Sequence, residues 1–404
     1  MGHPAALSWS RARVIARSAA PALAAVDTSL PGALGATLAD PIRALTDLPA
    51  YDASAMDGWA LCGSGPWRVV GESRPGQVPP PVSAGEAVSI TTGSVLPEGS
   101  DTVLRSEDAH LELEGRRVLG VDPLTGIPDT TWRPRAWTDV RRRGEECRSG
   151  DLLVAAGLTV TPAIIGLAAA AGHDVLRVLH PPTVSILITG DELLDSGLPR
   201  PGHVRDALGP MLPAWIAELG GRAHPPLRIA DRASSLREAL EDADADLIVT
   251  TGSTAAGTSD HLRVVLTDLG AHWLVDGVAV RPGHPMMLAR LGDGRLVLGL
   301  PGNPLAAISG LLTLGAPILE AMRGLPADVE PTRVFLGAEV RPHPDDTRLI
   351  PVAIERQPRP TAMPLRFTGP AMLRGLAHAD ALAVITPDSG RRGDVIEVLG
   401  LASR

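Results

Sequence analysis

The sequence has 404 residues, enough for two or more hydrophobic cores, and a formal net charge of −9 at pH 7. This negative charge, with no dense run of basic residues, argues against nucleic acid as the main partner. All 37 basic residues are arginines. Lysine chemistry is therefore excluded, and a bound anion must be held by arginine, histidine, hydroxyl groups or backbone N–H groups.

The cysteines and the apolar runs indicate where the protein works. Cys62 and Cys147 are the two cysteines, without C-x-x-C spacing, so neither a disulfide framework nor a cysteine-based zinc site is expected. The arginines near the amino terminus lie on an alanine-rich segment, which predicts a helix rather than a signal peptide. Uninterrupted apolar runs reach about eight residues, whereas a membrane helix needs ~20. We expect a cytoplasmic protein without a membrane segment.

The amino-terminal part of the chain predicts one helix and then β-structure. Residues 8–27 indicate a helix broken near Pro21, and residues 31–49 form a connecting region. From residue 51 to about residue 150, short β-runs alternate with glycine and proline, which is typical of a small β-barrel or sandwich. The runs expected to be strands lie at 67–70, 87–90, 102–104, 111–113 and 117–119.

The rest of the chain predicts an α/β region followed by more β-structure. Residues 160–171 indicate a helix, with Pro162 in its first turn and Gly172 at its end. Residues 181–325 alternate strands and helices in the order that builds a parallel sheet. Helices are expected at 206–219, 232–243, 259–269 and 304–322, and later strands at 333–340, 349–355, 381–385 and 394–399. The predicted fold class is α/β plus β.

Three strand-to-turn units in the α/β region predict a binding site. Residues 183–192, 246–260 and 295–304 each combine a buried-strand pattern with a glycine-containing turn. In an open α/β sheet, ligands bind at the carboxyl ends of the strands, where such turns offer backbone N–H groups to anions. Three converging turns would form a pocket rich in donors and carboxylates, which suits a phosphorylated substrate held with a divalent metal.

Seven short motifs occur in order along the chain. They are Ser54–Ala60 (S-A-M-D-G-W-A), Thr92–Asp101, Arg143–Glu146 (R-G-E-E), Thr189–Leu193 (T-G-D-E-L), the turn at 252–260, Arg281–Pro285 (R-P-G-H-P) and Leu300–Pro304 (L-P-G-N-P). Each match is weak alone. In this order and at these spacings, over nearly the whole chain, they resemble the MoeA/gephyrin E-domain family, the molybdopterin molybdenumtransferases.

The resemblance implies an elongated, multi-domain subunit. Its expected parts are a MoaB/MogA-like α/β pterin-binding domain (1–27 plus 181–325), a connecting and dimerisation domain (28–50 plus 150–180), an inserted β-rich domain (51–149) and a C-terminal β-barrel (326–404). It also implies a homodimer, with the pocket between the α/β domain of one subunit and the β-rich domain of the other. Contacts with other proteins of molybdenum cofactor biosynthesis are left open.

The reaction implied by the resemblance is Mg²⁺-dependent insertion of molybdate into adenylylated molybdopterin, with release of AMP. Its catalytic residues would be Asp57, Glu192, Asp246 and Asp260, the last three also as metal ligands. Carboxylates suit Mg²⁺, which would neutralise charge as the AMP phosphate leaves. Without the resemblance, the residues alone favour a helix N-cap for Asp260 and the end of an acidic loop for Asp246, and fit an Asx-turn at Asp57 equally well.

The resemblance also implies a set of substrate-binding residues. The pterin phosphate would be cradled by the backbone of Gly252, Ser253 and Thr254, with Pro301, Gly302 and Asn303. Arg281 and His284 would contact the oxyanion, while Thr92, Gly93 and Glu146 would belong to the second wall. Ordinary turns and a solvated charge at Glu146 are the alternatives on the residues alone.

Several positions depart from the family pattern. Ala255 and Ala306 stand where the family has serine, Arg281 and His284 where it has lysine, and Gly369-Pro370 where it has G-S. A family arginine aligns with either Arg348 or Pro351, and Asp206-Ala-Leu208 lacks the asparagine of the family's D-x-N. Since a charged hydrogen bond is worth roughly 1.5–3 kcal/mol, these losses could weaken molybdate binding by powers of ten.

Three functions therefore stay open at the level of sequence. The first is the family reaction. The second is a paralogue that keeps the pterin-type pocket but acts as a carrier, or on a different nucleotide, with weak or absent molybdate insertion. The third is a dimeric scaffold for protein partners.

Overall fold

The computed structural model describes residues 6–114, 116–252, 261–327 and 330–401. Contacts within the chain separate two compact units. The first unit comprises residues 1–27, 35–39 and 177–404, and the second comprises residues 28–34 and 40–176. The finer division into four domains stays a prediction.

The centre of the first unit is a mixed β-sheet. Its strand order is β19-β16-β21-β25-β24-β22, with β20 pairing to β16. The central strands β16 (Thr183–Thr189), β21 (Leu247–Thr251) and β25 (Leu296–Leu300) are parallel, as are β19 (Arg222–Ala223) and β20 (Leu227–Ile229) to β16. The far edge is antiparallel, formed by β24 (Met287–Arg290) and β22 (His272–Asp276). The prediction of a parallel sheet is thus confirmed for its centre and wrong for this edge.

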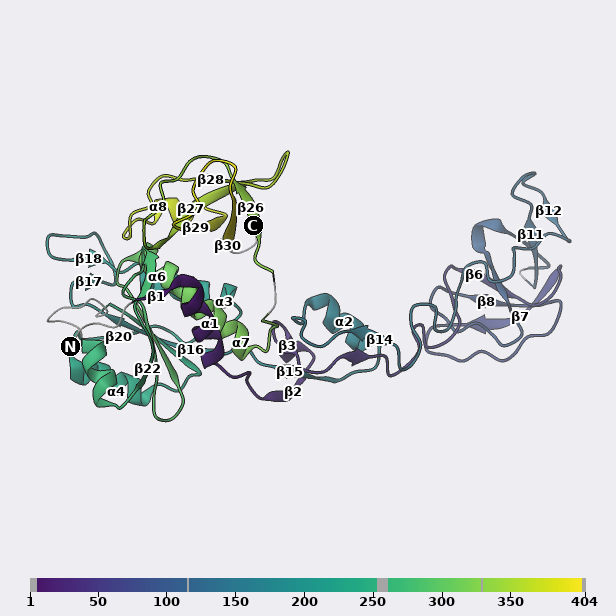
Figure 1. Cartoon of the computed structure of the whole chain (residues 1–404). Helices are drawn as coiled ribbons and strands as arrows, with labels where there is room; N and C mark the ends of the chain where they lie inside the picture. Colours follow the sequence, from purple (N-terminus) through teal and green to yellow (C-terminus); the bar gives the residue numbers. More distant parts are fainter. Residues whose placement is uncertain (1–5, 115, 253–260, 328–329, 402–404) are drawn as a thin grey trace. The chain divides into compact units, whose positions relative to one another are not determined.

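Helices cover both faces of this sheet (Figure 1). On one face lie α1 (Trp9–Ala19), α3 (Leu208–Glu218) and the run from Pro304 to Met322, all contributing to one buried core. On the other face lie α4 (Ala233–Asp242) and α5 (His261–Asp268), which belong to a second core. Successive strand residues point to opposite faces, so Leu247 joins the first core and Ile248 the second. The central strands are therefore apolar on both sides.

The helical run from Pro304 to Met322 is a core element. It consists of α6 (Pro304–Gly310), a π-helical turn (Leu311–Gly315) and α7 (Ala316–Met322). Among the described residues, it is the one helix long and apolar enough to cross a membrane, yet 89% of its apolar window is buried within the protein. A helix that is apolar all round suits burial in the middle of a large domain.

The expectation of a helix over residues 8–27 is wrong at its carboxyl end. Helix α1 ends at Ala19, and residues 25–29 form strand β2 (Ala25–Ser29). Pro21 disfavours a helical conformation for the residue before it, so the helix ends here rather than continuing after a break.

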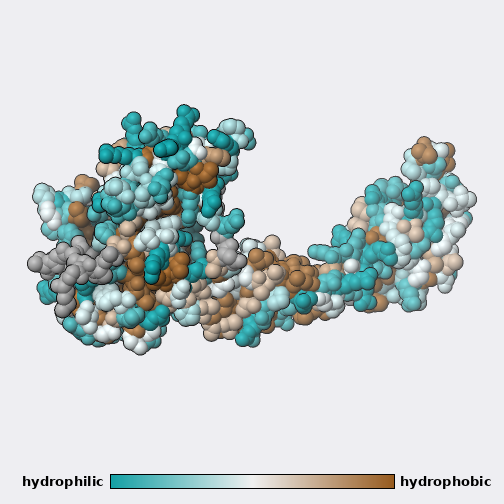
Figure 2. All heavy atoms as spheres, in the orientation of Figure 1, coloured by the Kyte–Doolittle hydropathy of each residue, from teal (hydrophilic) through white to brown (hydrophobic). Residues whose placement is uncertain are grey.

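The C-terminal residues form a closed five-stranded β-barrel, as predicted. Each strand pairs with two others in the ring β26-β28-β27-β29-β30, which closes back on β26. The strands are β26 (Arg333–Leu336), β27 (Thr347–Glu355), β28 (Thr361–Pro364), β29 (Ala381–Ile385) and β30 (Val395–Gly400), with a short helix α8 (Arg374–Ala377) before β29. Strand β28 was not predicted, because it is short and ends in proline. Hydrophilic side chains gather on the visible face of this barrel in Figure 2.

The barrel is joined to the α/β part by backbone pairing. Strand β23 (Val278–Arg281) follows β22 of the central sheet along the chain and pairs in parallel with β27, so that Arg281 lies opposite Arg348. Strand β1 (Leu7–Ser8) pairs with the other edge of β23. The two parts of the first unit therefore share one β-sheet.

The second unit is dominated by the predicted β-rich region. Its main sheet has the order β10-β11-β7-β8-β6-β9, with β12 pairing to β11. The strands are β6 (Gly58–Leu61), β7 (Trp67–Ser73), β8 (Glu86–Ile90), β9 (Thr102–Arg105), β10 (Ala109–Glu112), β11 (Arg117–Val121) and β12 (Pro128–Asp129). Fully buried Leu61, Trp67 and Val118 belong to its core.

Short paired strands and one helix complete the chain. In the second unit, β5 (Ala53–Ser54) pairs with β13 (Val140–Arg141), and β4 (Ile42–Arg43) pairs with β14 (Leu152–Val154). Helix α2 (Pro162–Ala170) is capped by the Thr161 hydroxyl, which accepts a hydrogen bond from the Ile164 N–H at 3.3 Å. The remaining paired elements are β3 (Thr37–Leu38) with β15 (Val175–Leu179) and β17 (Leu193–Leu194) with β18 (Val204–Arg205).

Candidate active site

A cavity of about 610 Å³ lies at the carboxyl ends of the central parallel strands. We call it the strand-end cavity. It is lined by residues that follow three strands: Glu192 after β16, Gly252 after β21, and Gly302 with Asn303 after β25. The three turns singled out in the sequence therefore converge, because parallel strands end at the same edge of a sheet.

Glycine is required where these turns approach each other. Gly252 has φ +83°, and a Cβ built on it would lie 2.8 Å from the Thr189 hydroxyl. That hydroxyl donates a hydrogen bond to the Thr251 carbonyl at 2.6 Å, and the Gly252 N–H donates to the Leu300 carbonyl at 3.0 Å. The strand ends are thus tied together. Asn303 directly precedes the helical run that starts at Pro304, whose amino-terminal partial positive charge favours an anion.

Among the described residues, Glu192 and Asp206 are the carboxylates that line the strand-end cavity. Asp206 is a residue that the sequence analysis did not place in the site. One carboxylate oxygen, Oδ1, accepts a hydrogen bond from the Gly209 N–H at 2.9 Å at the start of α3. In the sequence, an aspartate just before a helix indicates an ordinary helix cap rather than a site residue. What brings it beside Glu192 is the parallel pairing of β17 with β18, which follow and precede these two residues.

The donor set of this cavity fits a hard cation that keeps water and substrate ligands. Mg²⁺ is commonly bound through one or two carboxylates, with waters and phosphate oxygens completing its shell. Within the described part of the chain, no group of three or more His, Cys, Asp or Glu residues could hold a metal ion. Glu192 and Asp206 are the residues that could contribute to such a site. Asp260, together with Ser253, Thr254 and Ala255, lies outside the described residues.

The prediction that Asp246 belongs to this site is wrong. Asp246 directly precedes β21, whereas the strand-end cavity follows it. Its Oδ2 accepts hydrogen bonds from the Thr183 N–H at 2.8 Å and the Thr183 hydroxyl at 2.7 Å. Thr183 begins β16, which is seven residues long, so Asp246 lies roughly 20 Å from the cavity end of the sheet at ~3.3 Å per residue. It fastens the starts of two parallel strands.

A second cavity of about 410 Å³ adjoins the first and carries positive charge. We call it the basic cavity. Its charged or ionisable lining residues are Arg281, His284 and Arg348, and the described lining includes no carboxylate. Asn303 lines both cavities. Pro301 also lines this cavity. Of the two barrel positions considered for the family arginine, Arg348 lines the cavity and Pro351 does not.

The cationic side chains of the basic cavity are held in place by hydrogen bonds. Arg281 Nε lies 2.6 Å from Asp346 Oδ2, and Arg348 donates from Nη1 to the Arg341 carbonyl. His284 Nδ1 lies 2.8 Å from the Val278 carbonyl oxygen. Because a carbonyl can only accept, Nδ1 carries the proton, which leaves Nε2 as the other ring nitrogen for a ligand.

Most of the family departures that the structure describes gather in this basic cavity, whereas Leu208, which stands where the family has asparagine, lines the strand-end cavity. Arg281, His284, Ala306 and Pro370 all line the basic cavity. The Pro370 carbonyl accepts from the Leu305 and Ala306 N–H groups at 2.9 and 3.2 Å, which occupies donors at the start of α6. The basic cavity therefore has the nitrogen-bearing side chains of Arg281, His284, Arg348 and Asn303 but fewer hydroxyl donors than the resemblance implies; Thr368 supplies one.

Asp57 and Thr92 are brought together in the second unit. The exposed Asp57 carboxylate accepts hydrogen bonds at Oδ1 from the Thr92 N–H at 2.7 Å and from its hydroxyl at 3.0 Å. These two donors lower the pKa of Asp57 below its ordinary value. Gly93 adopts φ +84° and donates from its N–H to the Ser54 carbonyl at 2.8 Å. The turn at 92–93 thus supports the turn that carries Asp57.

Glu146 and its neighbours have other surroundings. Glu146 is exposed, and its N–H donates to the Leu48 carbonyl at 2.9 Å. Arg143 Nε pairs with Asp47 at 2.7 Å, and Arg142 stacks over Trp137 with its guanidinium carbon 4.5 Å from the ring centre. Arg142 and Arg143 therefore each contact a neighbouring residue while remaining exposed.

Comparisons with known proteins agree with this combination of fold and cavities. Family models match along the chain: the MoeA N-terminal region (domain I and II) over residues 7–172, a "Probable molybdopterin binding domain" over 185–321, and the MoeA C-terminal region (domain IV) over 333–401. The strand-end cavity falls in the second match, and the barrel in the third. The class that fold and site define is thus a multi-domain α/β-plus-barrel transferase.

Individual relatives point the same way. Proteins named molybdopterin molybdenumtransferase from Staphylococcus epidermidis and Staphylococcus aureus are 27% and 28% identical, covering 93% and 91% of this chain and 90% and 88% of their own. The crystal structure of a molybdopterin biosynthesis MoeA protein from Pyrococcus horikosii matches with a TM-score of 0.75 and 25% identity, covering 97% of this chain and 98% of that one. The chain belongs to the MoeA family, enzymes of molybdenum cofactor biosynthesis.

Removal of the Asp246 carboxylate should lower stability without changing the strand-end cavity. In Asp246→Ala, the Thr183 N–H and hydroxyl lose their acceptor, at a cost of about 1–3 kcal/mol. We expect a lower melting temperature but unchanged nucleotide affinity in the folded protein. Glu192→Gln serves as the control, with the opposite pattern expected. If Asp246→Ala kept its full thermal stability but lost ligand affinity in calorimetry, Asp246 would be a residue of the binding site after all.

The pKa of Asp57 should depend on Thr92. Thr92→Val removes the hydroxyl donor and keeps the N–H, so the pKa of Asp57 should rise toward its ordinary value. Because the pKa is depressed in the folded protein, the carboxylate contributes stability above the unfolded pKa and loses it as pH falls through the folded pKa. Carbon-detected NMR titration measures this. The matched control is Thr131→Val, whose hydroxyl and N–H bind Asp129 in the same way. Equal titration of Asp57 in both variants would contradict the assignment.

Proposed function

We propose that this protein is a molybdopterin molybdenumtransferase that inserts molybdate into adenylylated molybdopterin, releases AMP and depends on Mg²⁺. The observation that carries the proposal is the pair of adjoining cavities that share Asn303. One offers carboxylates and strand-end backbone donors, and the other offers Arg281, His284 and Arg348. The larger strand-end cavity would take the pterin nucleotide, and the smaller basic cavity would take the tetrahedral oxyanion.

Each cavity has a distinct part in this proposal. The strand-end cavity would bind the pterin phosphate through backbone N–H groups at Gly302 and Asn303, since the Gly252 N–H already donates to the Leu300 carbonyl. Glu192 and Asp206 would hold Mg²⁺, which would supply neutralisation of the phosphate charge as AMP departs. The two arginines would bind molybdate oxygens, since guanidinium groups offer several donors in a fixed plane. His284 would add a donor at Nε2 in its doubly protonated form, because its Nδ1 already donates to the Val278 carbonyl. Because Asn303 lines both cavities, the oxyanion would lie beside the pterin ligand.

We further propose that the protein works as a cytoplasmic homodimer. The resemblance implies that Asp57 and Thr92 of one subunit complete the cavity of the other. Its support here is the separation of the chain into two units, with the two cavities in the first and the Asp57–Thr92 pair in the second. Contacts with other proteins of the same biosynthesis stay a prediction.

The direct test is reconstitution of the reaction. Purified protein receives adenylylated molybdopterin, Mg²⁺ and molybdate, and both released AMP and molybdenum cofactor are measured, the latter by activation of a cofactor-free molybdoenzyme. Formation of both products that depends on molybdate and Mg²⁺ is expected. A protein that binds the nucleotide tightly yet forms no cofactor at millimolar molybdate would overturn the proposal.

A carrier of molybdopterin is the second candidate, favoured by the missing hydroxyl at Ala306 and the absence of lysine at position 284. The double variant Ala306→Ser with His284→Lys separates the candidates. If the protein is an enzyme, wild type turns over, and the variant should lower the KM for molybdate by about tenfold or more, because it adds an oxyanion donor and a permanent charge. The affinity for the pterin nucleotide should not change.

The control for this variant is His272→Lys, which introduces the same charge at an exposed position at the start of edge strand β22, among residues that do not line the basic cavity. Turnover that appears only in the double variant would favour the carrier. An unchanged KM for molybdate in both variants would show that the basic cavity does not bind the anion.

Mixed dimers test whether Asp57 serves the other subunit. Asp57→Asn and Glu192→Gln should each keep only a small residual activity that can still be measured. If the site is shared between subunits, a heterodimer has one pocket with both native residues and one with both replaced. Equilibrated equal amounts contain half heterodimers, so about a quarter of wild-type activity should return. Subunits that use their own Asp57 would give no recovery.

A further inference from the structure

The turn that carries Asp57 is held from two sides. It connects β5 to β6 in the second unit. On one side, the Ala55 N–H donates to the Asp139 carbonyl at 2.7 Å; on the other, the Ser106 N–H donates to the Asp57 carbonyl at 3.0 Å. The position of the Asp57 backbone is therefore set by two segments that are distant in sequence.

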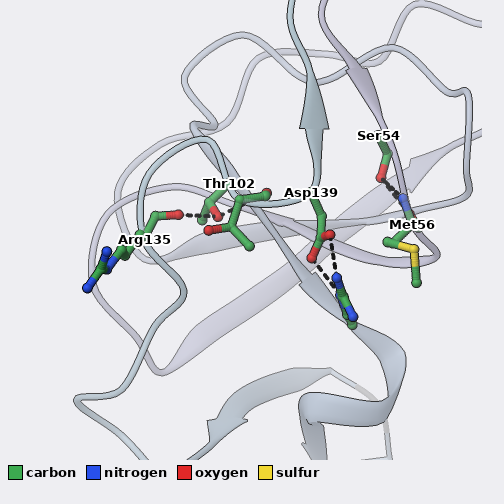
Figure 3. A network of polar contacts seen from close by, with 7 residues as sticks. Ser54, Met56, Thr102, Arg135 and Asp139 are labelled. Atoms are coloured by element: carbon green, nitrogen blue, oxygen red, sulfur yellow. Dashed lines mark hydrogen bonds and ion pairs between the residues drawn. The ribbon is translucent and has the colours of Figure 1, made fainter.

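An ion pair joins these two segments (Figure 3). Arg105 donates from Nε to one oxygen of Asp139 at 2.7 Å and from Nη2 to the other at 2.8 Å. This two-point arrangement fixes orientation as well as distance. Arg105 directly precedes Ser106, and Asp139 itself supplies the carbonyl that binds Ala55. The ion pair thus closes a ring of contacts around the turn.

Other contacts further restrict the conformation of these segments. The Thr102 hydroxyl donates to the Arg135 carbonyl at 2.9 Å and holds the segment before Asp139 along β9, as Figure 3 shows. Asp139 has a φ of +56°, a conformation that few side chains adopt without support. A Cβ built on Gly58 would lie 1.9 Å from the Leu104 carbonyl oxygen, so β6 and β9 are in backbone contact beside the turn.

We propose that Arg105 and Asp139 are positioning residues for Asp57, acting through the turn at residues 54–57. This inference rests on the proposed function, in which Asp57 acts at the pocket. The sheet does not depend on the ion pair, because β6 and β9 pair through their backbones over their full length, from Gly58–Arg105 to Leu61–Thr102. With Arg105 41% exposed, the pair adds little to global stability. Its effect falls on the orientation of the turn.

A double-mutant cycle tests the proposal in the full-length protein. Arg105→Gln should lower kcat by about tenfold, while the KM for molybdate stays unchanged, since misplacement of a site group acts on the reacting geometry. In an Asp57→Asn background, Arg105→Gln should cause no further loss, because a residue that acts only through Asp57 has nothing left to position. Arg105→Lys keeps the charge but not the two-point contact and should behave like Arg105→Gln.

The control is Arg117→Gln. Arg117 lies in the same β-rich region, is 39% exposed and pairs with Glu112 at 3.4 Å, so it reports the loss of an ordinary surface ion pair. It should leave kcat unchanged. Equal effects of Arg117→Gln and Arg105→Gln, or additive losses in the Asp57→Asn background, would overturn the positioning role.

A second measurement does not need activity. The hydrogen bonds from Thr92 lower the pKa of Asp57, so a displaced turn should raise it. NMR titration should show this rise in Arg105→Gln and Arg105→Lys, but not in Arg117→Gln, with melting temperatures close to wild type. An unchanged Asp57 titration in both Arg105 variants overturns the inference even if the enzyme is active. Conversely, a wild type that forms no cofactor while its Asp57 titration shifts as stated would overturn only the proposed function.

Discussion

Parallel hydrogen bonding among β16, β21 and β25 is the constraint on which the site depends. The register aligns Val184 with Leu247 and Leu247 with Leu296, so all three strands run in one direction and end at one edge. The turns that follow these strands therefore lie at the same edge, where Glu192, Gly252 and Gly302 line one cavity. The same register sends Asp246 to the opposite end of the sheet. Asp246 lies one residue before β21 and Glu192 three residues after β16, so the length of the parallel strands separates the two carboxylates.

A second backbone pairing builds the basic cavity. Strand β23, which follows β22 of the α/β sheet along the chain, pairs with β27 of the barrel and sets Arg281 directly beside Arg348. Two like charges on neighbouring strands repel each other. Asp346 offsets part of this repulsion through its contact with Arg281 at 2.6 Å. A bound dianion would offset the rest, so the arrangement is one that a small oxyanion stabilises.

Most of the described departures from the MoeA family pattern share a location and a physical character. Arg281, His284, Ala306 and Pro370 line the basic cavity, where neutral hydroxyl donors are reduced and arginine and histidine nitrogens remain. The departure in the strand-end cavity is Leu208, which stands where the family has asparagine. The strand-end cavity keeps its glycines and two carboxylates. The two cavities therefore diverge separately, since one is formed largely from backbone and the other from side chains that single substitutions change.

The sequence by itself determined the elements and the kind of chemistry. Apolar runs predicted β16, β21 and β25, glycine and proline marked the helix limits, and the ordered motifs identified the family, because these signals are local. Only the tertiary structure decided which residues meet. It excluded Asp246 and added Asp206, because a carboxylate's place depends on strand direction and on the pairing of β17 with β18. It also selected Arg348 and tied Asp57 to Arg105 and Asp139, through contacts between segments whose separation along the chain hides them from any local pattern.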